Sequence, residues 1–248
     1  MNVELAALAL APGLAIGSFL NVVAARLPLH RSIVSPGSAC MSCGTPLAWY
    51  DNIPLVSYVV LRGRCRHCKA AIPWRYPAVE AATALLIAGC ALKFGWSWDF
   101  LIGSAFCAVL VVISATDLER RVIPNRIVVP ASMVLLIAQT LVHPSAEWAI
   151  AAVAAALFFL LAALAYPGGM GMGDVKLAFL LGAVLGRTVA IALLGGMIFA
   201  LVPSFVLLVR HGSKARKMAI PFGPFLALGG VVALFFGTPI LNWYLGVL

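Results

Sequence analysis

The sequence predicts an all-α membrane protein, a polytopic helical bundle of about eight transmembrane helices that carries one small polar domain. Hydrophobic residues make up 63% of the 248 residues, and the mean hydropathy of +1.07 exceeds what a soluble domain of this size contains. Apolar runs of about 18–22 residues recur along the chain, which is the length of helix that crosses a bilayer. Most of the 17 basic residues fall in short loops between these runs, as orientation signals do.

Eight apolar runs define the expected helices. The sixth run is short, and its first residue depends on how deeply the preceding glycine-rich run lies in the membrane. The first run contains Gly13, Gly17 and Ser18, small residues that permit close helix packing. It also contains Asn21, which we interpret as an interhelical hydrogen-bonding residue rather than a catalytic one. The runs lie at about 4–25, 77–94, 99–116, 127–143, 147–166, 174–187, 189–209 and 221–243.

The distribution of charge sets the expected orientation. With the N-terminus external, eight spans leave only Lys93 and Arg187 outside, so that 15 of the 17 basic residues face the cytoplasm. The net charge of +9 could suggest nucleic-acid binding, but the positions of the charges indicate a protein oriented in a lipid bilayer. Glu4 precedes every basic residue, which is not the order found in a cleavable signal peptide.

The sizeable polar stretch is 26–76, between a first helix at 1–25 and a seven-helix core at 77–248. It is too small to build a stable hydrophobic core alone. Two Cys-x-x-Cys pairs separated by 21 residues resemble a tetrahedral zinc site, and Gly44 suits the tight turn that follows the first pair. The expected zinc ligands of this small cytoplasmic domain are Cys40, Cys43, Cys65 and Cys68.

Two disulfides or a redox pair are the alternative for these cysteines. A cytoplasmic loop disfavours disulfides, and no thioredoxin-like pattern surrounds the pairs, so we predict a structural zinc ion. Four thiolates leave no open coordination position for catalysis, and we expect His67 to be an exposed loop residue. Cys90 and Cys107 lie in apolar runs and are expected to be packing residues.

Two acids at membrane edges lie on the same predicted face. Asp117 follows the third run, and Asp174 opens the sixth directly after Gly171 and Gly173. Each acid alone has a structural explanation, because Asp117 could pair with a neighbouring arginine and Asp174 could be an acid at a helix N-terminus. Their shared side and depth favour a functional pair, and the glycines would let a helix or an extended peptide approach closely.

Paired aspartates suit aspartyl peptidase chemistry, because two carboxyl groups that share a site do not both ionise easily. The ionised carboxyl takes a proton from water, and the protonated one polarises the scissile carbonyl. Two alternatives remain open: an ion-coupled transporter, whose acids would lie near the bilayer midplane, and a zinc-stapled scaffold without chemistry. Glu80, at the start of the second apolar run, has a plain explanation as a helix-capping acid.

Seven short stretches form a series that extends from the first run to the sixth. They are Gly17–Val23, the two cysteine pairs, Tyr50–Pro54, Tyr76–Glu80, Asp117–Asn125 and Gly171–Leu177. In these stretches and in their order, the chain resembles the bacterial type IV prepilin peptidases. The region after about residue 190 carries no matching motif.

The resemblance implies that Asp117 and Asp174 are the catalytic aspartates of a membrane endopeptidase, with Gly171 and Gly173 in the same catalytic element. The implied substrates are type IV prepilins and type II secretion pseudopilins, which carry a short basic leader before a long apolar helix. The leader would be removed at the cytoplasmic membrane face.

The resemblance also implies a second activity, N-methylation of the newly exposed pilin N-terminus with S-adenosylmethionine as the methyl donor. This activity is associated with the cysteine-containing region, which relatives that only cleave do not have. The implied contacts with the methyl donor are Asn52 and Glu80. Cleavage without methylation remains an alternative.

Overall fold

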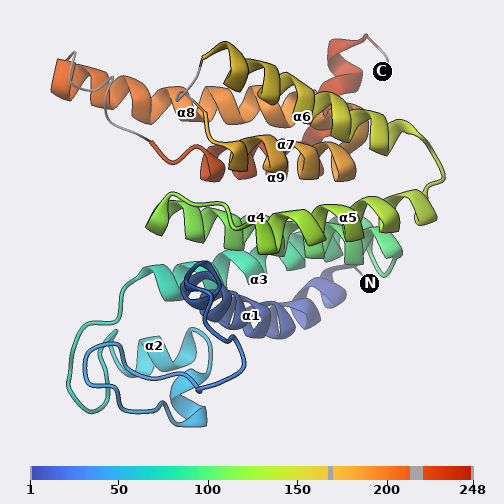
Figure 1. The fold of residues 1–248 in the computed structure, drawn as a ribbon. Coiled ribbons are helices and arrows are strands. Elements are labelled where there is room, and N and C mark those ends of the chain that lie inside the picture. Colours follow the sequence, from blue (N-terminus) through green and yellow to red (C-terminus); the bar gives the residue numbers. More distant parts are fainter. Residues whose placement is uncertain (1, 167–169, 213–219, 247–248) are drawn as a thin grey trace. The chain divides into compact units, whose positions relative to one another are not determined.

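The computed structural model describes residues 2–166, 170–212 and 220–246, shown in Figure 1. The described chain is helical apart from two isolated β-bridges, which confirms the all-α prediction. It divides into two compact units, Met1–Ala115 and Thr116–Leu248, and each is described by itself. The glycines at 168–169 and the basic residues at 214–217, which entered the sequence argument, lie outside the described residues.

The eight predicted membrane runs each coincide with an α-helix. Seven described stretches are long and apolar enough to cross a membrane, and one of them, Met172–Arg210, contains both the sixth and the seventh runs. The α-helices are α1 (Asn2–Arg26), α2 (Val56–Val60), α3 (Arg75–Phe94), α4 (Trp98–Arg120), α5 (Asn125–Val142), α6 (Glu147–Ala165), α7 (Met172–Leu185), α8 (Val189–His211) and α9 (Gly223–Tyr244). Short 3₁₀ helices are η1 (Leu27–Leu29), η2 (Trp49–Asn52) and η3 (Gly186–Thr188).

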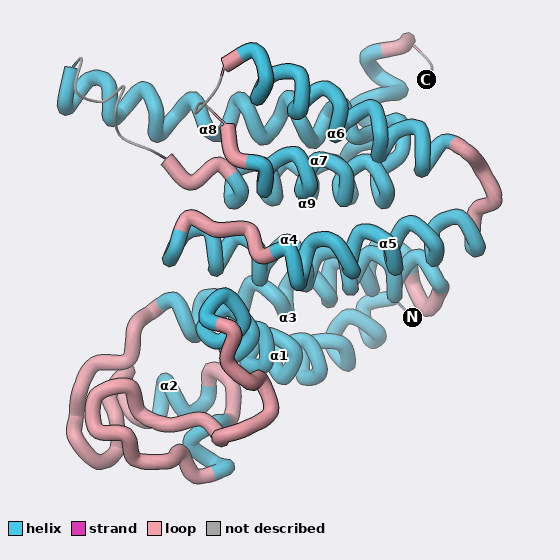
Figure 2. Tube along the Cα trace, viewed as in Figure 1, coloured by secondary structure: helices cyan, strands magenta, loops and turns pink. Residues whose placement is uncertain are grey.

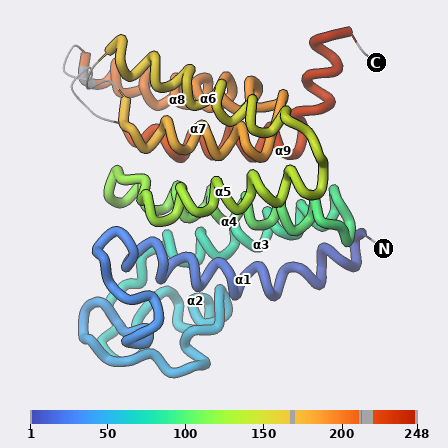
Figure 3. Tube along the Cα trace, turned by 45° about the vertical axis from the view of Figure 1, so that its right-hand side comes forward, coloured from blue at the N-terminus to red at the C-terminus, as the bar shows by residue number. Residues whose placement is uncertain are grey.

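In the first unit, α1 packs closely against α3, and Figures 1 and 3 both show the two helices side by side. Gly13 and Gly17, four residues apart, form the contact. A Cβ added at Gly13 would lie 2.7 Å from the Ala84 Cα, and one added at Gly17 would lie 2.6 Å from the Glu80 Cα. This is the close backbone approach that small residues permit between membrane helices, and it confirms the role predicted for these glycines.

Polar and sulfur groups complete the helix packing of this unit. The Asn21 side-chain amide on α1 donates to the Tyr76 carbonyl on α3 at 3.0 Å, which is the interhelical bond that the sequence predicts. The sulfur atoms of Cys90 on α3 and Cys107 on α4 lie 3.9 Å apart, and both residues are buried. Both cysteines are therefore packing residues, as predicted.

In the second unit, α7 is the most enclosed helix. It has 14 residues and is therefore about 21 Å long, shorter than the hydrocarbon thickness of about 30 Å. Gly182 of α7 lies so close to α6 that an added Cβ would meet the Ala151 carbonyl oxygen. From Val175 to Leu185 nearly every side chain is buried, so neighbouring helices shield α7 from the surrounding solvent or lipid. Figure 3 shows α6, α8 and α9 gathered around it.

The boundaries of α4 and α7 differ from those predicted. We expected the third run to end at residue 116 with Asp117 just outside it, but α4 continues to Arg120 and includes Asp117. We expected the sixth run to begin at Asp174, but α7 begins at Met172. Polar residues continue each helix because the backbone bonds of a helix do not depend on apolar side chains.

Candidate functional site

The two cysteine pairs form the same kind of turn. The Cys40 amide bonds to the Thr45 carbonyl at 3.0 Å, and the Cys65 amide bonds to the Ala70 carbonyl at 2.9 Å. The residue after each pair has a left-handed backbone, with φ of +71° at Gly44 and +59° at Lys69. The structure thus confirms the turn predicted at Gly44. Lys69 adopts the same conformation with an ordinary side chain, at some steric cost.

The four cysteines come together in space. They are free thiols, and their sulfur atoms all lie within 4.8 Å of one another, with 3.8 Å between Cys40 and Cys68. Zinc–sulfur bonds of about 2.3 Å in a tetrahedron require sulfur atoms about 3.8 Å apart. The residues present therefore fit a tetrahedral metal ion, and His67, an exposed residue of the second turn, is not a member of the cluster.

Hydrogen bonds favour the thiolate form at three of the four cysteines. The backbone N–H of Cys43 lowers the pKa of Cys40, and the backbone N–H of Cys68 lowers the pKa of Cys65. A hydrogen bond with the Thr45 side chain lowers the pKa of Cys43. The Ala70 N–H acts in the same direction on Cys68, but desolvation and the neighbouring sulfur atoms outweigh it and raise the pKa of Cys68 to about 11. Thiolates are the form that binds metal.

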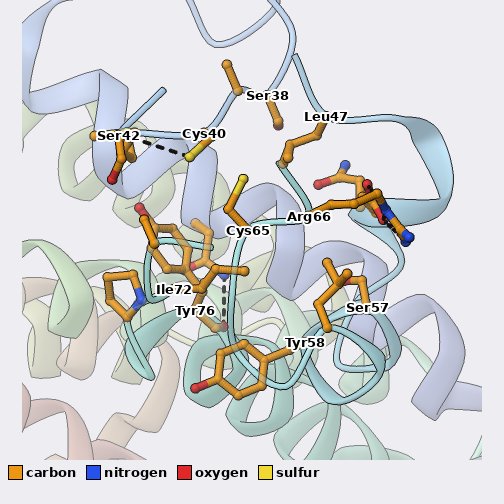
Figure 4. Close-up of a pocket in the computed structure, with 18 of the residues that line it drawn as sticks. Ser38, Cys40, Ser42, Leu47, Ser57, Tyr58, Cys65, Arg66, Ile72 and Tyr76 are labelled. Atoms are coloured by element: carbon orange, nitrogen blue, oxygen red, sulfur yellow. Dashed lines mark hydrogen bonds and ion pairs between the residues drawn. The ribbon is translucent and has the colours of Figure 1, made fainter. Parts of the chain in front are cut away.

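A cavity of about 240 Å³ lies in the first unit beside the cysteine cluster. Figure 4 shows Cys40 and Cys65 on its wall, with the Cys40 sulfur directed toward Ser42. Asn52 and Glu80, the two residues predicted to contact a cofactor, both line this cavity. The polar segment that surrounds it consists mainly of loops, as Figure 2 shows, so the cavity owes its shape to side-chain contacts more than to regular structure.

Glu80 is buried, with 9% of its surface exposed. Its Oε2 atom accepts a hydrogen bond of 2.8 Å from the backbone N–H of Leu55, whose φ of +59° is unfavourable for a side chain of this type. The interpretation of Glu80 as a helix cap is wrong, because α3 begins five residues earlier at Arg75. Glu80 forms no ion pair with the described residues, and its carboxyl group also has a hydrogen bond with the Ser18 side chain.

Asp51 and Arg66 form a second polar contact on the cavity wall. Arg66 Nη2 lies 2.7 Å from Asp51 Oδ1, Arg66 Nε also donates to the same carboxylate, and the guanidinium lies 5.4 Å from the centre of the Tyr50 ring. These hydrogen bonds lower the pKa of Asp51 below its ordinary value. The sequence analysis missed this pair, although an acid in Tyr50–Pro54 and an arginine inside the second cysteine pair were available signals.

The second unit brings the two predicted aspartates together. Asp117 lies one turn before the end of α4 and has 5% of its surface exposed. Asp174 occupies the third position of α7. The two carboxyl groups are close enough to interact electrostatically. The α4–α5 connection helps to bring them together, because an added Cβ at Gly173 would lie 2.9 Å from the Cβ of Ile123.

Asp117 is not an arginine-paired surface acid. It forms no ion pair within 4 Å with the described residues, and Arg120 lies 3.8 Å from Glu119, but the positive charge of Arg121 does act on the Asp117 carboxyl. The Asp117 Oδ2 atom accepts a hydrogen bond of 2.9 Å from the backbone N–H of Gly223. Sequence analysis missed this contact, because its partner lies in the region that carries no recognised motif.

Asp174 does accept a hydrogen bond at the N-terminus of its own helix, as its structural explanation predicts. Its Oδ2 atom accepts a hydrogen bond from the Gly171 N–H at 3.3 Å, and its own N–H donates to the Gly171 carbonyl at 3.1 Å. The neighbouring Lys176 is held elsewhere, since its Nζ atom lies 2.7 Å from the side-chain oxygen of Asn125. Asp174 is half-buried, lies beside the buried Asp117 and forms no ion pair with the described residues. This is a suitable arrangement for a proton-sharing pair.

Two family profiles match the chain. The profile described as the Bacterial Peptidase A24 N-terminal domain matches residues 12–94. The profile described as the Type IV leader peptidase family matches residues 104–209. Together the two matches include the cysteine cluster, the cavity and both aspartates.

Curated proteins named prepilin leader peptidase/N-methyltransferase are similar along almost the whole chain. One from Burkholderia pseudomallei (strain 1026b) is 36% identical over 274 residues, covering 94% of this chain and 86% of the relative. One from Bacillus subtilis (strain 168) is 34% identical, covering 94% and 95%. One from Pseudomonas aeruginosa is 35% identical, covering 94% and 91%. No solved structure matches the chain.

Proposed function

This chain belongs to the type IV leader peptidase family, and on that premise we propose that it is a membrane aspartyl endopeptidase with N-methyltransferase activity. It removes the short basic leader of type IV prepilins, and of type II secretion pseudopilins, and then methylates the new N-terminal amine. Membership of this family favours an enzymatic function over an ion-coupled transporter and over a scaffold without catalytic activity.

The observation that carries the peptidase proposal is the proximity of Asp117 and Asp174, which lie near enough for their charges to interact, with Asp117 buried and Asp174 half-buried. Such a pair holds one proton between its members. The ionised carboxyl accepts a proton from a water molecule as the water attacks the scissile carbonyl. The protonated carboxyl polarises that carbonyl and then protonates the departing amine. Gly171 leaves room beside Asp174 for the extended backbone of the substrate, while Gly173 permits the close contact with Ile123 that brings α7 to the α4–α5 connection.

The proposed orientation follows the distribution of basic residues. The N-terminus is external, and the aspartates and cysteine segment are on the cytoplasmic face of the inner membrane. Asp117 and Asp174 each lie within one turn of a helix end, rather than in the middle of a span. A cytoplasmic leader therefore reaches them while the apolar pilin helix remains in the bilayer.

We assign the methyl donor to the cavity of the first unit. S-adenosylmethionine carries a cationic sulfonium and a cationic amine, and Glu80 is a buried carboxylate of the cavity wall without a basic partner. The Asn52 amide supplies further hydrogen-bonding capacity. S-adenosylmethionine bound there would supply the methyl group, and Glu80 and Asn52 would hold its cationic end.

We propose that the metal of the four-cysteine cluster is structural zinc. Cys40, Cys43, Cys65 and Cys68 would saturate a tetrahedral ion and leave no position for substrate. Its contribution is to hold two turns of a segment that has little regular structure of its own. The cavity wall depends on those turns, because Cys40 and Cys65 form part of it.

The test is to incubate the purified full chain, in lipid nanodiscs, with a type IV prepilin and S-adenosylmethionine. We expect one mass spectrum to show loss of the leader and gain of one methyl group on the product. Leader loss without methyl gain would support the peptidase-only alternative. An uncut prepilin would contradict the proposed function as a whole.

A further inference from the structure

The contact between Gly223 and Asp117 joins two segments of the second unit that are 106 residues apart in sequence. Gly223 is the first residue of α9, and it is buried. The N–H groups of the first helical turn have no acceptor within their own helix. The Gly223 N–H therefore depends on an acceptor from elsewhere, and the Asp117 carboxylate supplies it at 2.9 Å.

We propose that Gly223 is a positioning residue of the peptidase reaction, whose backbone N–H fixes the orientation of the Asp117 carboxyl. This inference rests on the proposed function, because it concerns the same aspartate pair. It adds a third structural element, the N-terminus of α9, to the two that carry the acids. It also assigns a role to residues beyond 209, where the family profile ends.

The direction of the hydrogen bond determines which oxygen atom can react. A backbone N–H only donates, so the Asp117 Oδ2 atom must accept and cannot hold a proton toward Gly223. The hydrogen bond disfavours protonation of Oδ2 and so favours Oδ1 as the atom of Asp117 that exchanges a proton with water or substrate. The same reasoning applies to Asp174, whose Oδ2 accepts from the Gly171 N–H at 3.3 Å. Each carboxyl thus has one oxygen anchored by backbone and one left for chemistry.

The space around Gly223 explains why this position carries no side chain. An added Cβ would lie 2.8 Å from Asp117 Oδ2 and 3.2 Å from its Cγ, which is too close for either atom to remain in place. The adjacent Phe222 ring stacks on the buried Phe159 ring of α6 at 6.0 Å between centroids. Pro224 restricts the next backbone angle. The N-terminus of α9 therefore cannot easily move away to accommodate a methyl group.

The first test compares Gly223→Ala with Gly195→Ala. A displacement of the Asp117 carboxyl by about 1 Å should lower kcat for leader cleavage about 10²-fold. KM should be unchanged, because Gly223 is not proposed to contact the leader. Gly195 of α8 is the matched control, because an added Cβ would meet its nearest atom, the Gly229 Cα, at an ordinary 3.7 Å. Gly195→Ala should cleave at the wild-type rate.

A structural defect and a positioning defect give different results. If Gly223→Ala only disrupted folding, methyl transfer to a pilin supplied without its leader would fall with cleavage, and the melting temperature would drop. The proposal predicts that methyl transfer and melting remain close to wild type. Cleavage by Gly223→Ala at the wild-type rate, while Asp117→Asn is inactive, would overturn this inference and leave the proposed function standing. Cleavage by Asp117→Asn would overturn the proposed function itself.

A second measurement does not require the Gly223 variant to fold. In wild-type protein, the Gly223 amide should exchange slowly with deuterium because Asp117 accepts its hydrogen bond. Proline has no amide hydrogen, so a peptide covering 221–226 reports few amides. Asp117→Ala should increase deuterium uptake in that peptide by about one hydrogen, with the remainder of α9 unchanged. Equal uptake in wild type and Asp117→Ala would contradict the proposed contact.

Discussion

The cysteine cluster of the first unit and the aspartate pair of the second unit are assembled differently. Cys40 and Cys43 lie beside a second cysteine pair that forms the same local turn. Asp117, in contrast, accepts its hydrogen bond from a backbone amide 106 residues later in the sequence. The cavity of the first unit is lined by loops and by the ends of α1 and α3, with the cysteine cluster on its wall. The aspartates of the second unit lie on packed helices. The methyl-donor site that we propose is therefore partly formed by loops, which can adjust to a ligand, while an aspartyl pair requires fixed geometry. The comparison implies that the two activities can be damaged separately.

The largest expected effect is on the aspartate pair. Asp117→Asn and Asp174→Asn should each lower leader cleavage by about 10³-fold or more, because each removes one proton-transfer group. The double variant should be little worse than either single one, since the two residues act as a unit. Asp174→Glu should also be impaired, because a longer side chain misplaces the carboxyl. Initial rates of prepilin cleavage measure all four variants.

Glu119→Gln is the matched control, since Glu119 lies on the same helix two residues from Asp117 and is close to Arg120. It should cleave at nearly the wild-type rate. An Asn variant of either aspartate that retained cleavage would show that the pair is not the catalytic centre.

The second effect concerns the cysteine cluster. Cys40→Ser or Cys65→Ser should lower the zinc content and increase protease cleavage within residues 26–76 by about 10²-fold, because metal binding stabilises this segment. Elemental analysis and timed proteolysis measure the two quantities. Cys90→Ala removes a packing thiol of the same unit and should keep the zinc content. Wild-type protein purified without zinc or another bound metal would contradict the structural role.

A smaller effect is expected at Glu80. Glu80→Gln keeps an acceptor for the Leu55 N–H but removes the charge, so affinity for S-adenosylmethionine should fall about tenfold. Titration calorimetry measures this affinity. Glu80→Ala also removes the acceptor of the Leu55 N–H, so it should disturb the loop around Leu55 more than Glu80→Gln does. It should reduce methyl transfer more than cleavage. Unchanged affinity in Glu80→Gln, or equal loss of both activities in a folded Glu80→Ala protein, would assign Glu80 a structural role.

The smallest effect is expected from the Asp51–Arg66 pair, because Arg66 is 46% exposed and such pairs contribute little. Asp51 has a lowered pKa, so its stabilising contribution is present above the ordinary pKa of about 3.9. That contribution is lost as pH falls through the lower value of the folded protein. Asp51→Asn should raise the proteolysis rate of the segment no more than about fivefold at pH 7. The difference from wild type should diminish below about pH 4; a constant difference would contradict this account.

The sequence was sufficient for features that depend on local patterns. Apolar runs located α1 and α3–α9, Gly13 and Gly17 indicated the helix contact, and the spacing of the cysteines indicated their cluster. Each of these signals involves residues within a few positions of one another or a repeated motif. The physical requirement, such as bilayer length or tetrahedral coordination, is therefore visible in the sequence itself.

Contacts between distant segments were not predictable in the same way. The Gly223 amide has no side chain that could mark it as a partner of Asp117. The Glu80 contact with Leu55 also depends on a backbone N–H group and on a left-handed φ. A leucine in the sequence gives no indication of either. Helix ends were misplaced because a hydropathy pattern ends where polar residues begin, while α4 continues through Asp117 to Arg120.

The most direct test of the central claim, that cleavage and methyl transfer use separate groups, is a paired assay of Asp117→Asn. The variant receives either a full-length prepilin or the same pilin without its leader, each with S-adenosylmethionine, and both products are read by mass spectrometry. We predict that the full-length substrate remains uncut, while the leaderless pilin gains one methyl group at the wild-type rate. Loss of methyl transfer to the leaderless pilin in a folded variant would contradict the account.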